Sequence, residues 1–159
     1  MEYLHVTSPE FREMSPIPIK YTRYGANINP PLNLDRIPDT ARSLVILVED
    51  PDALWTGRVH WMAWNIPVTR HIREKRVMEC EGKNDFGLNG YTGPILPFGT
   101  HRYRFRVYAL DTLLTLPAGA SLAELKRAMS GHIAGSGELT GIFSGSRVFK
   151  AHVGVMGAA

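Results

Sequence analysis

From Gly90 to Tyr108 the chain reads Gly-Tyr-Thr-Gly-Pro-Ile-Leu-Pro-Phe-Gly-Thr-His-Arg-Tyr-Arg-Phe-Arg-Val-Tyr. A loop rich in glycine and proline therefore runs directly into a segment in which arginines alternate with apolar residues, as far as Ala109. This period of two predicts a β-strand with one solvated and one buried face. His101 stands at the junction, and functional residues often lie on loops that a rigid element supports.

Two further segments predict buried strands. Ser43–Val48 is a continuous apolar run that stops at Glu49-Asp50-Pro51, and Val59–Asn65 is a second such run. Pro67 ends the second, because proline cannot donate a hydrogen bond to a central ladder. We also expect a last strand that includes Phe143 and continues from Arg147 to Val155.

A single helix is predicted near the C-terminal third of the chain. Ser121 is followed three residues later by Glu124, which is the capping-box pattern. Apolar residues then recur at helical spacing as far as Ile133, and Gly131 is expected to end or kink the helix. The helical face comprises Leu122, Leu125, Met129 and Ile133. Many short strands with little helix predict an all-β sandwich.

Size and composition place the chain among ordinary globular proteins. Its 159 residues suit a single domain over 1–159, with 44% hydrophobic and 21% charged residues. The formal charge of +3 carries no run of lysine or arginine, so we expect no nucleic-acid partner. One cysteine, no signal-like N-terminus and no long apolar run predict a cytoplasmic protein without an integral membrane segment.

Three clusters carry residues capable of chemistry: Glu49–Ala53 at a strand end, His60-Trp61 inside a strand, and His101–Tyr103 after the loop. Each has an ordinary structural explanation. Carboxylates at strand ends often cap turns, and a histidine in an apolar strand is usually a hydrogen-bonded core residue. The clusters become informative only if the fold brings them together.

The order of these motifs resembles the phosphatidylethanolamine-binding protein family, and in particular its compact bacterial and archaeal branch described as Raf kinase inhibitor-like. The resemblance runs from about Gly25 to Phe143. The matching segments are Val48–Ala53, Val59–Pro67, Gly82–Gly87, Gly90–Pro94, Gly99–Asp111, Ala128–His132 and Gly141–Phe143.

The resemblance implies a β-sandwich of two antiparallel sheets with a few peripheral helices and a small pocket for phosphate-like anions at one end. Carried over by position, the pocket residues are Asp50, Asp52, His60, Gly93, Pro94, His101 and Tyr103. It further implies a phosphate-like or phospholipid head-group ligand, a protein kinase or protease as partner, and a homodimer. The expected cofactor is none.

The residue types agree with an anion pocket, because imidazole, phenol and backbone N–H groups are donors. A carboxylate has the wrong sign for phosphate. Asp50 is therefore expected either to hold one nitrogen of a histidine or to meet the ammonium of ethanolamine. Of Trp61 and Trp64, which alternate on their strand, one is expected in the core and the other at the pocket mouth. Leu54, Ile95 and Leu96 depart from the family pattern beside the pocket.

Three functions remain open. The first is a non-catalytic binding protein that regulates a kinase or protease. The second is a hydrolase, either metal-dependent with Asp50, Asp52, His60 and His101 as ligands, or acting by acid–base chemistry with one aspartate as the base. The sequence has no close metal-ligand spacing such as His-Glu-x-x-His. The third is an interaction protein whose pocket no longer serves a ligand.

Overall fold

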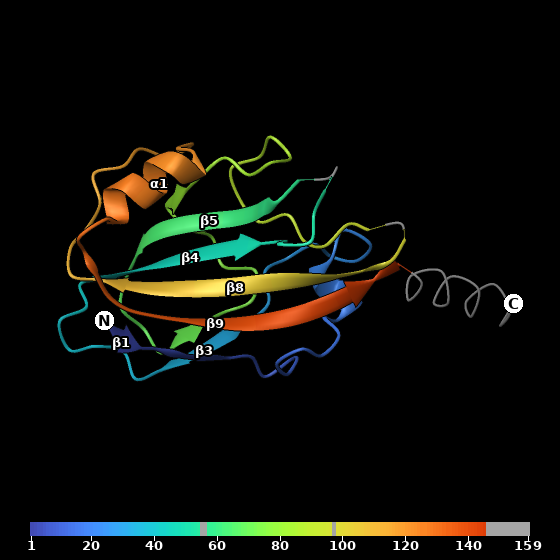
Figure 1. The fold of residues 1–159 in the computed structure, drawn as a ribbon, viewed down its shortest axis with the longest axis horizontal. Coiled ribbons are helices and arrows are strands. Elements are labelled where there is room, and N and C mark those ends of the chain that lie inside the picture. The colour runs from blue at the N-terminus through green and yellow to red at the C-terminus, as the bar shows by residue number, and fades with distance from the viewer. Residues whose placement is uncertain (55–56, 97, 146–159) are drawn as a thin grey trace, which may run out of the picture.

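The computed structural model describes residues 1–54, 57–96 and 98–145. Within them the chain forms two β-sheets, one α-helix and one short 3-10 helix (Figure 1). The elements in chain order are β1 (Glu2–Tyr3), β2 (His5–Thr7), η1 (Ile19–Tyr21), β3 (Leu32–Asp35), β4 (Ser43–Glu49), β5 (Val59–Ile66), β6 (His71–Ile72), β7 (Cys80–Glu81), β8 (Thr100–Leu110), α1 (Leu122–Met129) and β9 (Ile133–Ser144).

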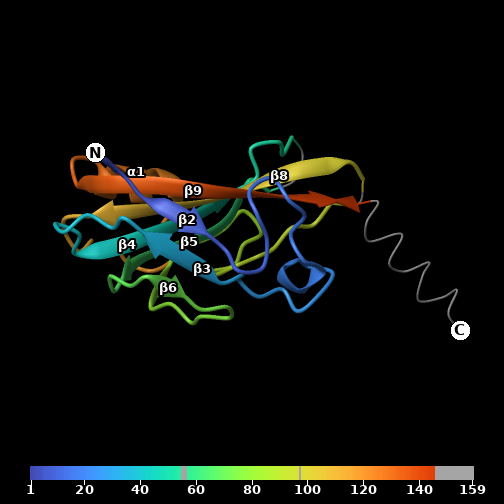
Figure 2. The same ribbon diagram turned by 90° about the horizontal axis from the view of Figure 1, so that it is seen from below.

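The larger sheet has the strand order β1-β9-β8-β4-β5-β7, and the smaller has the order β2-β3-β6. The two sheets stack as layers (Figure 2), which confirms the predicted sandwich. One detail differs from the prediction of purely antiparallel sheets, because β1 pairs with β9 in parallel. The chain leaves β1 at once for β2, so a single residue, the fully buried Leu4, carries it from one sheet to the other.

Strand alternation divides the larger sheet into two apolar faces. One face packs against the smaller sheet and includes Val48, Trp61 and Phe105. The opposite face carries α1, with Leu47 and Leu125 in the contact. The predicted alternation of β8 is confirmed. The residues at odd positions from 103 to 109 are buried, whereas the arginines at 102, 104 and 106 are half-buried or exposed.

The helix begins as the sequence predicts and ends earlier. Ser121 accepts from the Glu124 N–H while the Glu124 carboxylate reaches back to the N–H of Ser121, which is the capping box. Gly131 adopts a φ of 83°, in the left-handed region that favours glycine, and it ends the helical path. The inclusion of Ile133 in the helix was wrong, because Ile133 begins β9. Phe143 lies in β9 as expected, whereas Arg147–Val155 lie outside the described residues.

Candidate functional site

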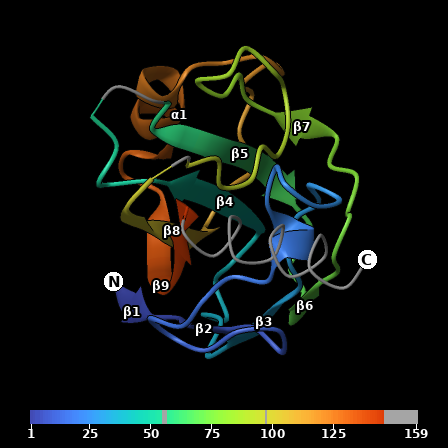
Figure 3. The same cartoon turned by 90° about the vertical axis from the view of Figure 1, so that its right-hand side faces the viewer.

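The site forms at the end of the larger sheet where β4 stops. Because β4 pairs antiparallel with both β5 and β8, its C-terminal end lies beside the first residues of those two strands. This pairing brings together four residues from distant parts of the chain: Asp50, His60, His101 and Tyr103. The condition under which these residues can act together is therefore met. Figure 3 looks onto this end, with η1 and its flanking segment beside the strands.

A β-bulge turns His60 toward this site. Val48 pairs with Trp61 and Glu49 pairs with Val59, so His60 is the extra residue on β5. A bulge interrupts strand alternation and re-aims a side chain. Trp61 belongs to the core between the sheets, and the neighbouring His60 ring also contacts that core, edge-on to Tyr103 with 5.2 Å between ring centroids. Alternation alone would place His60 and Trp61 on opposite faces.

Asp50 positions His101. Its Oδ2 lies 2.6 Å from His101 Nδ1, and its Oδ1 accepts the backbone N–H of Asp52 at 2.9 Å. The Asp50 carboxylate is almost fully buried, and the His101 side chain is one-fifth exposed. Of the two roles expected for Asp50, the structure shows the hydrogen bond to a histidine nitrogen. Holding Nδ1 in this way leaves Nε2 of His101 as the nitrogen that can meet another group.

His60 is held in one neutral form. Its Nδ1 lies 2.6 Å from the carbonyl oxygen of Thr92, and since a carbonyl only accepts, Nδ1 is the donor. Burial lowers the pKa of His60 below its ordinary value of 6.5, and the hydrogen bond to Thr92 and the charge of Asp50 oppose that shift only in part. Neutral His60 therefore carries its lone pair on Nε2 and can accept a hydrogen bond there.

We expect the His60 shift to make the protein less stable as the pH falls below about 6.5. The unfolded chain takes up a proton near that pH, whereas folded His60 resists protonation until the pH is lower, so proton uptake favours unfolding. Urea denaturation at several pH values between 5.5 and 8 measures this slope. His60→Asn, which keeps a donor for Thr92 but does not titrate, should flatten it. An unchanged slope in the variant would contradict the assignment.

Tyr103 has a hydroxyl group without a partner. Among the described residues, its oxygen is the one buried side-chain nitrogen or oxygen atom for which no hydrogen-bond partner is present. Burial raises the pKa of Tyr103 well above its ordinary value, and the nearby Asp50 raises it further, so the hydroxyl remains a proton donor. Native proteins pair nearly all such buried groups, and an unpaired one calls for an explanation.

The Asp52 carboxylate forms its hydrogen bonds with Arg102. Its Oδ2 accepts from the backbone N–H of Arg102 at 2.9 Å and from Nε at 3.0 Å, while its Oδ1 accepts from Nη2 at 2.8 Å. These contacts to Arg102 lower the pKa of Asp52 to about 2. Asp52 thereby ties the loop after β4 to the start of β8, and its place in the pocket lining stays a prediction.

Gly93 allows the Gly/Pro loop to approach the backbone of Tyr21 closely. Its N–H donates to Asn27 Oδ1 at 2.8 Å, so this donor already has an acceptor within the chain. A Cβ at Gly93 would lie 2.2 Å from the carbonyl oxygen of Tyr21, which explains the glycine. Pro94 accepts from the Arg23 N–H through its carbonyl. These hydrogen bonds and this close packing hold the Gly/Pro loop against the segment around η1.

The three residues that depart from the family pattern differ in how deeply they are buried. Leu96 is buried in the core between the sheets, Ile95 is half-buried, and Leu54 is 83% exposed. The expectation for the tryptophans was half right. Trp61 and Trp64 do lie on opposite faces, but both are buried in cores, so neither stands at a pocket mouth.

Three residues of the site were not predicted. Phe86 packs on His60 with 5.0 Å between ring centroids. Asn84 ties the loops together, since its Nδ2 donates to Gly90 O and Thr92 Oγ1 and its Oδ1 accepts from the Phe86 N–H. Thr92 holds His60. All three fall within the segments that resembled the family, and that position was the signal available from the sequence.

The described residues contain neither a metal-binding cluster nor a membrane-spanning helix. Across 1–54, 57–96 and 98–145, no group of three or more histidine, cysteine, aspartate or glutamate side chains is arranged to hold a metal ion. In the same ranges, no helix has the length and apolar character needed to cross a membrane.

Comparison with known proteins adds a consistent set of similarities. The family model described as phosphatidylethanolamine-binding protein matches residues 7–144, which include every strand that builds the site. A UPF0098 protein of Pyrococcus horikoshii is 48% identical over 138 residues, covering 80% of this chain and 70% of its own. A UPF0098 protein of Methanothermobacter thermautotrophicus is 40% identical over 151 residues, covering 88% and 98%.

Solved structures show the same fold. The chain resembles the crystal structure of CT736 of Chlamydia trachomatis, a phosphatidylethanolamine-binding protein homologue, with a TM-score of 0.83 and 36% identity, over 91% of this chain and 99% of that one. It also resembles Escherichia coli YbcL, described as a new member of the mammalian family, with a TM-score of 0.81 and 25% identity, over 89% and 98% of the two chains.

Proposed function

Because the chain belongs to the phosphatidylethanolamine-binding protein family, we propose that it is a binding protein whose site at the end of β4 holds a small phosphate-bearing ligand. The observation that carries the proposal is the buried hydroxyl of Tyr103, which has no partner among the described residues. A phosphate oxygen is an acceptor that would complete it. A buried donor without an acceptor is unfavourable, so a ligand that supplies an acceptor to Tyr103 binds more tightly than one that does not.

The neighbouring groups are complementary to such a ligand. His101, fixed through Nδ1 by Asp50, offers Nε2, and Tyr103 lies two residues along the same face of β8. Neutral His60 offers an acceptor at Nε2, since its Nδ1 proton is held by Thr92. A site with a donor at Tyr103 and an acceptor at His60 favours a ligand that carries both kinds of group. Monoprotonated phosphate and phosphoethanolamine meet this requirement.

Tyr103→Phe tests the proposal through two opposite effects. Removing an unpaired buried hydroxyl should stabilise the ligand-free protein, by about 1 kcal/mol. The same change should weaken phosphoethanolamine binding about tenfold, because one hydrogen bond to a charged oxygen is lost. Urea denaturation and titration calorimetry measure the two quantities.

Tyr21→Phe is the matched control. The Tyr21 hydroxyl donates to Glu74 at 2.9 Å, so its removal should lower stability and leave affinity unchanged. The proposal fails if Tyr103→Phe binds phosphoethanolamine as tightly as the unmodified protein, or if the unmodified protein shows no binding at millimolar ligand.

A further inference from the structure

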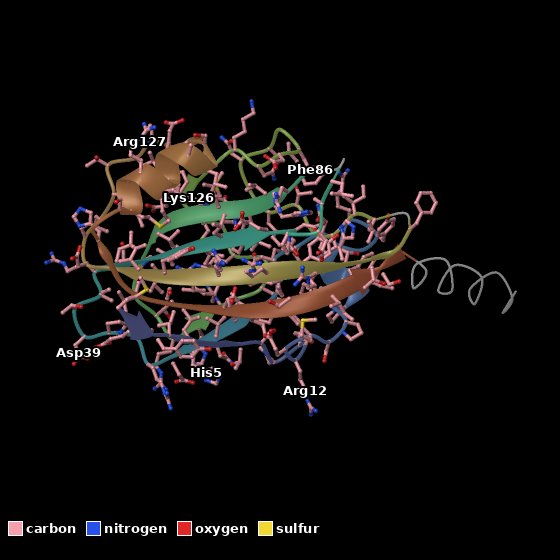
Figure 4. The ribbon with its side chains drawn as sticks, in the orientation of Figure 1. His5, Arg12, Asp39, Phe86, Lys126 and Arg127 are labelled. Atoms are coloured by element: carbon pink, nitrogen blue, oxygen red, sulfur yellow. The ribbon has the colours of Figure 1, made fainter. Side chains whose placement is uncertain are left out.

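The outer face of the larger sheet carries a polar groove of about 450 Å³ beside α1. Its lining includes four basic residues and one acidic one: Arg104 and Arg106 of β8, Lys126 of α1, Arg58 before β5, and Glu49 at the end of β4. His101 and Tyr103 lie at odd positions of β8 and therefore point to the other face of the sheet. Figure 4 shows Lys126 on the side of α1 nearer the sheet, and Arg127 on the opposite side.

The groove has more positive than negative side chains. Its lining holds four basic side chains against the single carboxylate of Glu49, whereas the whole chain has a formal charge of only +3. Arg104 and Arg106 share one further carboxylate, Glu138, at the long distances of 3.3 and 3.4 Å. Lys126 forms no ion pair among the described residues, and the Arg58 guanidinium donates to the neutral carbonyl of Pro51 at 2.9 Å.

This arrangement works against stability when the groove is empty. Arg104 and Arg106 stand on one face of a strand, two residues and roughly 7 Å apart, and like charges so placed repel. Their side chains are only 28% and 34% exposed, so water screens them incompletely. The basic groups come from three separate elements, and the fold rather than any local sequence motif brings them together.

We propose that this groove binds a small polyvalent phosphate anion, one that carries two or more phosphoryl groups. Guanidinium groups match phosphate oxygens with paired hydrogen bonds, and lysine adds a point charge. The volume lies within the range of small-molecule sites. Against the carboxylates of Glu49 and Glu138, the four basic groups leave two positive charges, and an anion with two or more phosphoryl groups carries enough negative charge to neutralise them. The groove differs from the site at Tyr103, because Arg104 and Arg106 occupy even positions of β8 and point away from the face that carries Tyr103.

Titration with inorganic triphosphate tests the groove. We expect Lys126→Glu to weaken binding at least tenfold and Arg104→Gln to weaken it severalfold. Lys75→Glu is the control: Lys75 is exposed beyond β6 in the other sheet, and both lysine variants reduce the formal charge from +3 to +1. His101→Ala should bind triphosphate as the unmodified protein does, with amide shifts in NMR spectra at residues 104–106 and 122–126.

Three outcomes would overturn the proposal. Equal weakening by Lys126→Glu and Lys75→Glu would show a general effect of net charge. Loss of triphosphate binding in folded His101→Ala would assign the anion to the other face. Absence of any binding at millimolar triphosphate and low salt would remove the site.

Discussion

Gly93→Ala is expected to destabilise the protein by roughly 3 kcal/mol, which is a large part of the stability of a domain of this size. The added Cβ would lie 2.2 Å from Tyr21 O and 2.9 Å from Thr22 Cα. Both are backbone atoms, so no side-chain rotation relieves the contact. Either the Gly/Pro loop or the segment around η1 must move. Thr92 directly precedes Gly93 and accepts the hydrogen bond of His60, so a shift of the loop would also disturb His60.

Denaturation in urea measures the loss, and calorimetry with phosphoethanolamine measures its consequence for the site. Asn27→Gly separates packing from hydrogen bonding, since it removes the acceptor of the Gly93 N–H and tolerates the left-handed φ of 57° at that position. It should cost only about 1 kcal/mol. If the two variants are equally destabilised, the close approach of Gly93 to Tyr21 does not explain the glycine.

His101→Ala is expected to destabilise the protein by about 3 kcal/mol and to abolish measurable phosphoethanolamine binding. The variant leaves the buried carboxylate of Asp50 without the side chain that lies 2.6 Å from its Oδ2. Removing one member of a buried pair is costly because the remaining charge stays out of water. The loss of binding follows from the loss of Nε2, which the proposed function places against the ligand.

A second variant distinguishes these two effects. In Asp50→Asn/His101→Ala the stranded charge is gone, so stability should partly recover while binding stays absent. The free energies of unfolding of the two single variants and the double variant form a thermodynamic cycle, and a coupling of 1 kcal/mol or more is expected for groups in direct contact. Additive effects would show that Asp50 does not position His101.

The elements predicted from sequence are those whose signal is local. The alternation from His101 to Ala109, the apolar run before Glu49 and the Ser121–Glu124 cap each act between neighbours in the chain, and each is present in the structure. The resemblance to the family supplied the residues of the site, and antiparallel pairing of β4 with β5 and β8 brought them together.

The error at Ile133 and the unforeseen contacts of Asp52 and Gly93 have a common physical origin. Ile133 fits the helical period, but Gly131 turns the chain and β8 offers a strand partner, so the residue joins β9. Asp52 and Gly93 have the composition of a ligand-binding loop, yet Arg102 and Asn27, 50 and 66 residues away, take their hydrogen bonds. Nothing local in the sequence identifies those partners.

The sequence by itself determined the strands β4, β5 and β8, where the helix begins and which residue types could meet an anion, because periodicity and capping depend on neighbours along the chain. Only the tertiary structure decided what each side chain faces. The bulge that turns His60 toward Tyr103, the contact of Asp50 with His101, the unpaired Tyr103 hydroxyl and the basic groove on the outer face all arise where strands from different parts of the chain pack together, and packing depends on the whole fold.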